Sequence, residues 1–110
     1  MTNITIYKNS NNQISKFVID GHAGYAREGS DIVCAAISFL TTNTINSIEA
    51  LTDSDFHSKK NVKQKGARVE CNFDKGMDDK ADVLLQAFEL GCKDLAKQYN
   101  KYVKLNFEEV

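Results

Sequence analysis

The chain has 110 residues, 42% of them hydrophobic, and this composition predicts a single domain over residues 1–110 with one small core. Its 14 basic and 15 acidic residues give a formal net charge of -1, so bulk charge does not favour binding to nucleic acid or to an acidic membrane. No basic segment precedes an apolar run at the start, and no apolar stretch approaches the roughly 20 residues that span a bilayer. We therefore expect a cytoplasmic protein without a membrane partner.

The first 20 residues predict a β-hairpin. Ile4 and Ile6 alternate with polar neighbours, residues 9–12 form a turn rich in Asn and Ser, and strand character resumes from Ile14 to Asp20. Glycines then recur at positions 21, 24 and 29. They predict a loop whose backbone is free to adopt unusual angles.

A long amphipathic helix is predicted from Asp31 to about Leu51, with Ser30 or Asp31 as its N-cap. The face expected to pack on the sheet recurs with the helical period: Val33, Ile37, Leu40, Thr44, Ile48 and Leu51. A second apolar strip on the far side needs either the second helix or another subunit to cover it: Ile32, Phe39 and Ala50. This strip leads us to expect a homodimer.

A second hairpin is predicted next, from a polar strand at residues 56–64 through a turn at residues 65–66. Its second strand alternates apolar with polar residues, and the apolar set is Ala67, Val69, Cys71 and Phe73. Residues 74–76 break this strand. Asp78 or Asp79 can then cap a second helix that extends to about Asn100. The apolar face of that helix is Ala81, Leu84, Phe88, Cys92, Leu95 and Tyr99.

Val103, Leu105 and Phe107 predict a last strand. The order hairpin, helix, hairpin, helix, strand is typical of an α+β fold. We expect a two-layer sandwich in which two helices cover one face of a mixed sheet of about five strands. The order of the strands within the sheet is left open by the sequence.

The segment GHAGYAREGSDIVC, residues 21–34, places an imidazole and a thiol at two backbone ends that can meet in space. His22 follows a strand, and Cys34 lies in the first turn of the predicted helix. The free N–H groups and the dipole of a helix start favour a thiolate over a thiol. An imidazole can take the thiol proton and later deliver a proton to a leaving amine. The pair is the minimum apparatus of a cysteine hydrolase, which needs no metal and no cofactor.

The residues GHA at 21–23 and GSDIVCAAIS at 29–38 resemble the ribosomal-processing cysteine protease family of small bacterial proteins. The resemblance implies that His22 and Cys34 are the catalytic dyad. It also implies an endopeptidase that removes the N-terminal extension of a large-subunit ribosomal protein precursor, with an apolar or aromatic residue before the cut. The recurring Asp and Ser of the family correspond to Asp31 and Ser38, whereas residues 24–28 have no counterpart.

Three residues are candidates for supporting roles. Asp31 can orient His22 as the third member of a triad, or it can serve only as a helix cap. Ser38, one turn beyond Cys34, can form a hydrogen bond in the site or bond back to a helix carbonyl, and the resemblance favours the site. Backbone N–H groups at the helix start, including that of Cys34, and the N–H of Gly21 or of the loop would form an oxyanion hole.

The remaining reactive residue types have simpler interpretations. Cys71 and Cys92 fall on apolar patterns, and we expect inert core thiols without a disulfide. His57 lies in a polar strand and is expected to be solvated. The lysine-rich run at residues 59–65 can face RNA or protect a sheet edge against aggregation, and we favour edge protection.

Two other functions compete with proteolysis. In a non-catalytic ribosome-assembly or peptide-binding module, His22 and Cys34 would be structural and the glycine loop would grip a peptide. In a thiol redox sensor, Cys34 would need a resolving cysteine beside it, and the sequence pattern places none there. Redox sensing is therefore the weakest of the three interpretations.

Overall fold

The computed structural model describes residues 1–27, 31–53, 57–63, 66–73 and 78–110, with the side chains of residues 57–63 and 66–67 left out. Its elements follow the predicted order: β1 Thr2–Lys8, β2 Ile14–Asp20, α1 Ile32–Leu51, β3 His57–Lys63, β4 Gly66–Asn72, α2 Asp79–Gln98 and β5 Val103–Glu109. The predicted Ser30 cap and the strand break at residues 74–76 lie outside the described residues.

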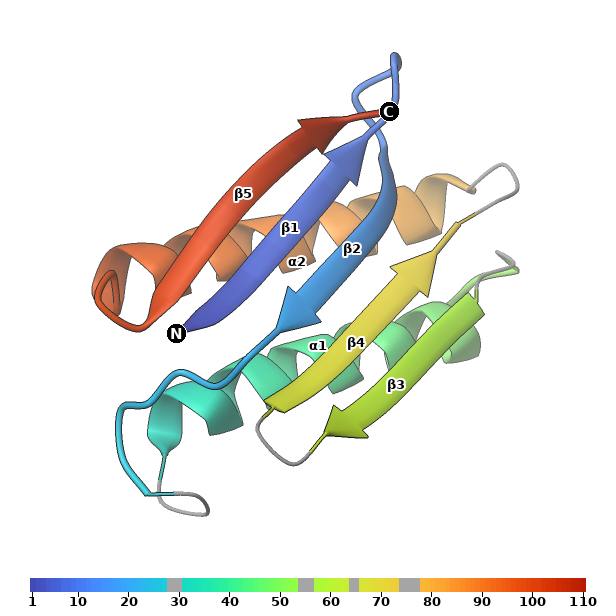
Figure 1. Ribbon diagram of the computed structural model, residues 1–110. Coiled ribbons are helices and arrows are strands. Elements are labelled where there is room, and N and C mark those ends of the chain that lie inside the picture. Colours follow the sequence, from blue (N-terminus) through green and yellow to red (C-terminus); the bar gives the residue numbers. More distant parts are fainter. Residues whose placement is uncertain (28–30, 54–56, 64–65, 74–77) are drawn as a thin grey trace.

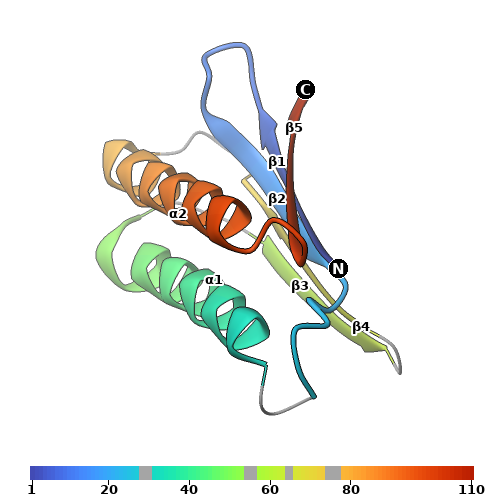
Figure 2. The ribbon, with the colours of Figure 1, turned by 90° about the vertical axis from the view of Figure 1, so that its left-hand side faces the viewer.

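The five strands form one sheet in the order β3-β4-β2-β1-β5. Neighbouring strands are antiparallel except β1 and β5, which run parallel, so the sheet is mixed. Both helices cover the same face of the sheet (Figures 1 and 2). The predicted α+β two-layer sandwich is thereby confirmed. Neither helix among the described residues is long and apolar enough to cross a membrane.

The core lies between the helices and the central strands. Ile4 and Ile6 of β1 are fully buried, and Ile6 pairs with Phe17 across the hairpin. The Phe17 ring packs against Phe88 of α2 at 4.4 Å and against Phe73 at 6.4 Å between centroids. Because inward residues alternate along each strand, these rings meet only in the register that the hairpin sets.

The buried face of α1 differs in part from the predicted one. Val33, Ile37, Thr44 and Ile48 are buried as predicted, but Leu51 is 63% exposed and Thr41 is buried instead. Leu51 is the last residue of the helix, so the apolar stripe ends before it. The hydroxyls of two of these residues, Thr41 and Thr44, donate to helix carbonyls at 2.7 Å, which is why they can be buried.

The two helices pack closely where Leu40 of α1 meets Gly91 of α2. A Cβ atom at residue 91 would lie 2.9 Å from Leu40 Cδ2, so only glycine fits without a shift. In α2, Leu85 is buried although the predicted face contained Leu84, which is half-buried. The buried face of α2 is therefore rotated slightly from the face that the sequence predicted.

The second apolar strip of α1 is not covered by α2. Ile32 is 55% exposed, Phe39 is 72% exposed and Ala50 is also exposed. Of the two covers expected from the sequence, the second helix is therefore excluded. Cover by a second subunit stays a prediction.

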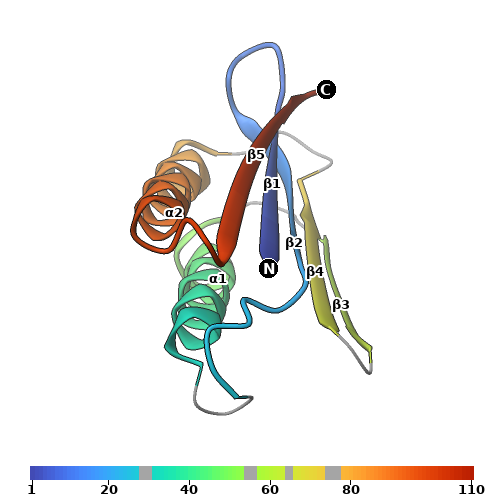
Figure 3. The ribbon, with the colours of Figure 1, turned by 60° about the vertical axis from the view of Figure 1, so that its left-hand side comes forward.

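The face of the sheet without helices carries a chain of ion pairs, and Figure 3 shows this side open. Lys16 Nζ lies 2.9 Å from Glu70 Oε1, and Arg68 bridges to Glu70 at 3.5 Å and to Asp20 at 3.9 Å. Val18 stands among these residues and is buried. At one edge of this sheet lies β3, as the edge-protection interpretation of its lysine-rich run requires.

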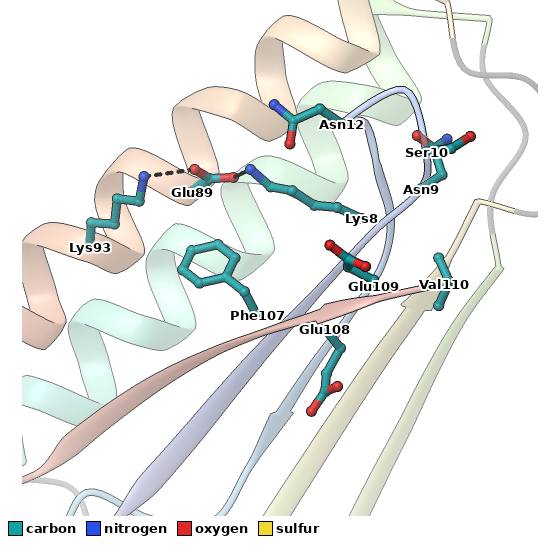
Figure 4. A pocket seen from close by; sticks show the side chains of 10 residues that line it. All are labelled: Lys8, Asn9, Ser10, Asn12, Glu89, Lys93, Phe107, Glu108, Glu109 and Val110. Atoms are coloured by element: carbon teal, nitrogen blue, oxygen red, sulfur yellow. Dashed lines mark ion pairs between the residues drawn. The ribbon is translucent and has the colours of Figure 1, made fainter.

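An open pocket of about 670 Å³ lies at the end of the sheet where β1 and β5 finish (Figure 4). Lys8 and Lys93 hold Glu89 between them at 2.8 and 2.9 Å, and both ammonium groups lie over the Phe107 ring. Burial raises the pKa of Glu89, but the hydrogen bonds from the two lysines lower it by more, so it lies below its usual value. The pocket is at the opposite end of β1 from His22.

Candidate active site

The first turn of α1 is fixed by Asp31, which is its N-cap. Asp31 Oδ1 accepts hydrogen bonds from the N–H groups of Val33 and Cys34, each at 3.0 Å. Its extended backbone, with φ -82° and ψ 101°, is the usual conformation of an N-cap. The predicted cap is confirmed, and it places Cys34, which is half-buried, in the first helical turn.

The second carboxylate oxygen of Asp31 holds the glycine loop. Asp31 Oδ2 accepts from the N–H of Tyr25 at 2.9 Å and from that of Ala26 at 3.4 Å. Among the described residues, neither oxygen bonds to the His22 ring. The sequence suggested a triad member or a cap, and the geometry adds a clamp between loop and helix that sequence reasoning missed.

The ionisation of Asp31 depends on these same contacts. Burial, which leaves it 8% exposed, raises the pKa of the carboxyl, but hydrogen bonds from the N–H groups of Cys34, Ala26 and Tyr25 and from the Cys34 side chain lower it by more. The pKa therefore lies below its usual value of 3.8. A carboxyl with a lowered pKa in the folded state stabilises the fold above the unfolded-state pKa, and this contribution is lost as the pH falls.

The variant Asp31→Asn distinguishes the two roles of this side chain, the helix cap made by Oδ1 and the contact with the loop made by Oδ2. The amide oxygen can still accept from Val33 and Cys34, but the amide nitrogen cannot accept from Tyr25. We expect urea unfolding at pH 7 to show a loss of about 1–2 kcal/mol, because the loop N–H groups lose a charged acceptor. The difference from wild type should shrink below about pH 3.8, because the unfolded chain takes up a proton there while the folded carboxyl, with its lowered pKa, does so only at lower pH.

The control for this substitution is Asp94→Asn on the exposed face of α2, where the carboxylate accepts a hydrogen bond from the Gln98 side chain. It should change the free energy of unfolding by less than about 0.5 kcal/mol. A loss in Asp31→Asn that is the same at pH 3 and pH 7 would contradict the assignment of the clamp to the carboxylate charge.

The Cys34 thiol faces the loop that carries the histidine. The Ala23 N–H donates to Cys34 Sγ with a donor-acceptor distance of 3.3 Å, and Ala23 itself is buried. Standard bond lengths place the Cα atom of His22 about 2.4 Å from the Ala23 nitrogen, so the histidine backbone stands beside the sulfur. The His22 side chain is exposed, and among the described residues it forms no hydrogen bond.

The loop leaves β2 through a glycine that no other residue can replace without strain. Gly21 has φ +94°, and a Cβ atom there would lie 2.5 Å from the carbonyl oxygen of Met1. Gly24 also has a positive φ, of +72°, but nothing lies within 4 Å of its Cβ position. The glycine predicted for backbone freedom in this loop is therefore strictly required at position 21.

Ser38 lies one turn beyond Cys34 and is exposed. Among the described residues its hydroxyl bonds neither to a site residue nor back to a helix carbonyl. The two other thiols are fully buried in the core as predicted, and burial together with a neighbouring glutamate raises the pKa of both Cys71 and Cys92 to about 12. Of the three cysteines, only Cys34 is half-buried and not fully buried.

Contact among three aromatic residues next to the site was not predicted from the sequence. The Tyr25 ring contacts Tyr102 at 5.1 Å and Tyr99 at 6.0 Å between centroids, edge to face in both cases. More than 70 positions separate Tyr25 from the other two in the chain. No local periodicity could have joined them.

A thiol in the first turn of a helix, beside a loop with a histidine, is the arrangement of a cysteine peptidase. The family model described as cysteine protease Prp matches residues 1–104. The chain belongs to this family, which confirms that it is a cysteine peptidase.

Individual relatives agree with this assignment. The ribosomal processing cysteine protease Prp of Staphylococcus aureus is 26% identical over 108 residues, covering 98% of this chain and all of that protein. The Bacillus subtilis protein of the same name is 22% identical and covers 96% of each chain.

Solved structures resemble the fold closely. A crystal structure of the Staphylococcus aureus protease with a covalently linked product peptide has a TM-score of 0.87 at 26% identity, and covers 98% of this chain and all of that one. The same protease with a substrate peptide has a TM-score of 0.81 at 25% identity, with the same coverage. A Streptococcus mutans protein also reaches 0.87, at 27% identity, over all of this chain and 96% of its own.

Proposed function

We propose that the whole chain, residues 1–110, is one cysteine protease domain that removes the N-terminal extension of a bacterial large-subunit ribosomal protein, with His22 and Cys34 as catalytic dyad. The observation that carries the proposal is the Cys34 thiol at the start of α1, 3.3 Å from the N–H of the residue that follows His22. The names of the relatives, which are ribosomal processing proteases, support the substrate class.

In the proposed mechanism, His22 takes the proton of Cys34 and the thiolate attacks the scissile carbonyl carbon. The tetrahedral intermediate collapses, the peptide C–N bond breaks, and His22 gives its proton to the departing amine. A thioester to Cys34 remains. Water, deprotonated by His22, attacks this thioester, and the thiolate leaves with the acid product released.

The oxyanion donor that the geometry supports best is the Ala23 N–H. The Cys34 N–H, which the sequence analysis proposed for this role, already donates to Asp31 in this structure. The Ala23 N–H points at the sulfur and can move to the substrate's carbonyl oxygen, which comes beside the sulfur when the carbonyl carbon bonds to it. Such a donor contributes typically about 100-fold to 1000-fold in rate.

The supporting roles follow from the contacts of each residue. Asp31 holds the loop of His22 against the helix start of Cys34 by accepting from both segments. Gly21 gives the loop its direction. Ser38 presents an exposed hydroxyl one turn from the thiol, and we assign it to substrate contact.

Two further elements belong to the same proposal. The exposed strip of Ile32, Phe39 and Ala50 on α1 supports a homodimer in which a second subunit covers it. A ribosomal protein precursor as substrate supports a cytoplasmic location, and the near-neutral charge supports a protein partner over direct contact with nucleic acid.

Intact-mass spectrometry of the ribosomal protein precursor tests the proposal. We expect wild type to remove the extension, Cys34→Ala to leave the precursor whole, and the core-thiol control Cys71→Ala to cut as wild type does. Cutting by Cys34→Ala would exclude the mechanism. A precursor that stays whole but binds tightly to wild type and to Cys34→Ala would favour the peptide-binding module.

A further inference from the structure

Three tyrosines meet at the end of the molecule that carries the thiol. Tyr25 belongs to the loop after β2, Tyr99 is the C-cap of α2, and Tyr102 lies in the turn before β5. The Tyr25 ring is edge-on to both others, at interplanar angles of 75° to Tyr102 and 85° to Tyr99. These are preferred geometries for aromatic pairs, so Tyr25 is seated although its side chain is 43% exposed.

The seat formed by Tyr99 and Tyr102 is itself rigid. The Tyr99 N–H donates to the Leu95 carbonyl at 2.9 Å, and the Tyr102 N–H donates to the Tyr99 carbonyl at 2.8 Å. The Tyr102 carbonyl accepts from the N–H of Thr2 at 2.9 Å, which ties the turn to β1. Figure 1 shows the turn between α2 and β5, the start of β1 and the loop after β2 at the same end of the sandwich.

The loop is held on both sides of the histidine. Gly21 fixes its exit from β2 against Met1, and the Tyr25 backbone is bonded to Asp31. Between these two points lie His22, Ala23 and Gly24, and the Ala23 N–H contacts the sulfur. A shift of the Tyr25 ring is therefore transmitted over three peptide units to the histidine.

We infer that Tyr25 is a positioning residue, whose contact with Tyr99 and Tyr102 holds His22 and the Ala23 N–H against the Cys34 thiol. This inference rests on the proposed function. An aromatic pair of this kind biases a two-state loop about 2-fold to 12-fold toward the seated state. A bias of this size changes the fraction of molecules whose site is competent, but it is too small to determine whether the protein folds.

The test uses Tyr102, because its side chain belongs to the seat and its backbone bond to Thr2 survives substitution. Tyr102→Ala should lower kcat about 2-fold to 12-fold with KM within about twofold, whereas Tyr102→Phe, which keeps the ring, should restore wild-type kcat. The double variant Tyr25→Ala with Tyr102→Ala should be no slower than Tyr25→Ala alone, since Tyr25→Ala already removes the contact that Tyr102→Ala removes. Tyr7→Ala is the matched control, because this ring contacts Lys16 on the face without helices.

A second readout does not require activity. The Ala23 amide proton should exchange with solvent about 2-fold to 12-fold faster in Tyr102→Ala than in wild type or in Tyr102→Phe. If wild type fails to cut any precursor, the proposed function fails, and the exchange rates alone decide the inference. Unchanged exchange at Ala23, or a raised KM with kcat preserved, would overturn it, and the raised KM would assign Tyr25 to substrate binding instead.

Discussion

His22→Gln is expected to lower kcat by about 100-fold to 10,000-fold while the protein stays folded. The expected loss is the usual contribution of a general acid and base, which glutamine cannot supply. Folding should be unaffected, because the His22 side chain is exposed and forms no hydrogen bond among the described residues. Initial rates of precursor cleavage and urea unfolding curves measure the two effects separately.

The second histidine of the chain provides the control. The backbone of His57 lies in β3 and pairs with Asn72 of β4, away from the loop between β2 and α1. His57→Gln should therefore cut the precursor at the wild-type rate. Activity in His22→Gln, or its loss in His57→Gln, would show that the wrong imidazole has been assigned.

Gly21→Ala is expected to destabilise the fold by about 2–6 kcal/mol. Two costs add at this position: a left-handed backbone, worth about 1–3 kcal/mol, and a clash with the Met1 carbonyl oxygen, worth a similar amount. Relief of the clash would move the loop away from β1 and take His22 with it, so cleavage should fall as well. Urea unfolding and precursor cleavage are the measurements.

Gly24→Ala is the comparison that isolates the clash. Its φ of +72° imposes a similar backbone cost, but no atom lies within 4 Å of its Cβ position. We expect a loss of only about 1–2 kcal/mol. Equal losses in the two variants would mean that the contact with Met1 contributes nothing.

The elements could be predicted because their signals are local. The alternation in β1 and β2 and the helical period of α1 and α2 placed all seven elements in order, and Ile14–Asp20 had the predicted bounds. The order of strands could not be predicted, since nothing near Val103 records that β5 lies parallel beside β1. Burial of Thr41 was missed because its hydroxyl is satisfied by the helix itself, which no polarity pattern reveals.

The candidate site, like the fold, was predicted only in its local features. Spacing, helix-start chemistry and the resemblance to a known protease family together were enough to propose His22 and Cys34, and Asp31 was one of two candidate caps. The second set of hydrogen bonds to Asp31, the Ala23 N–H on the sulfur and the seat of Tyr25 depend on a loop path set by the folded backbone. The first two contacts depend on the path of the loop, and the third forms only after segments more than 70 positions apart have met.

The parallel pairing of β1 with β5 also sets when the site can exist during synthesis. Thr2 pairs with Val103, so this contact closes almost the whole length of the chain and is among the slowest to form. Until residues 99–109 have been made, the loop of His22 has neither its tyrosine seat nor a completed sheet beneath it. A nascent chain that still lacks residues 99–109 therefore lacks both the parallel strand beside β1 and the aromatic contacts of Tyr25.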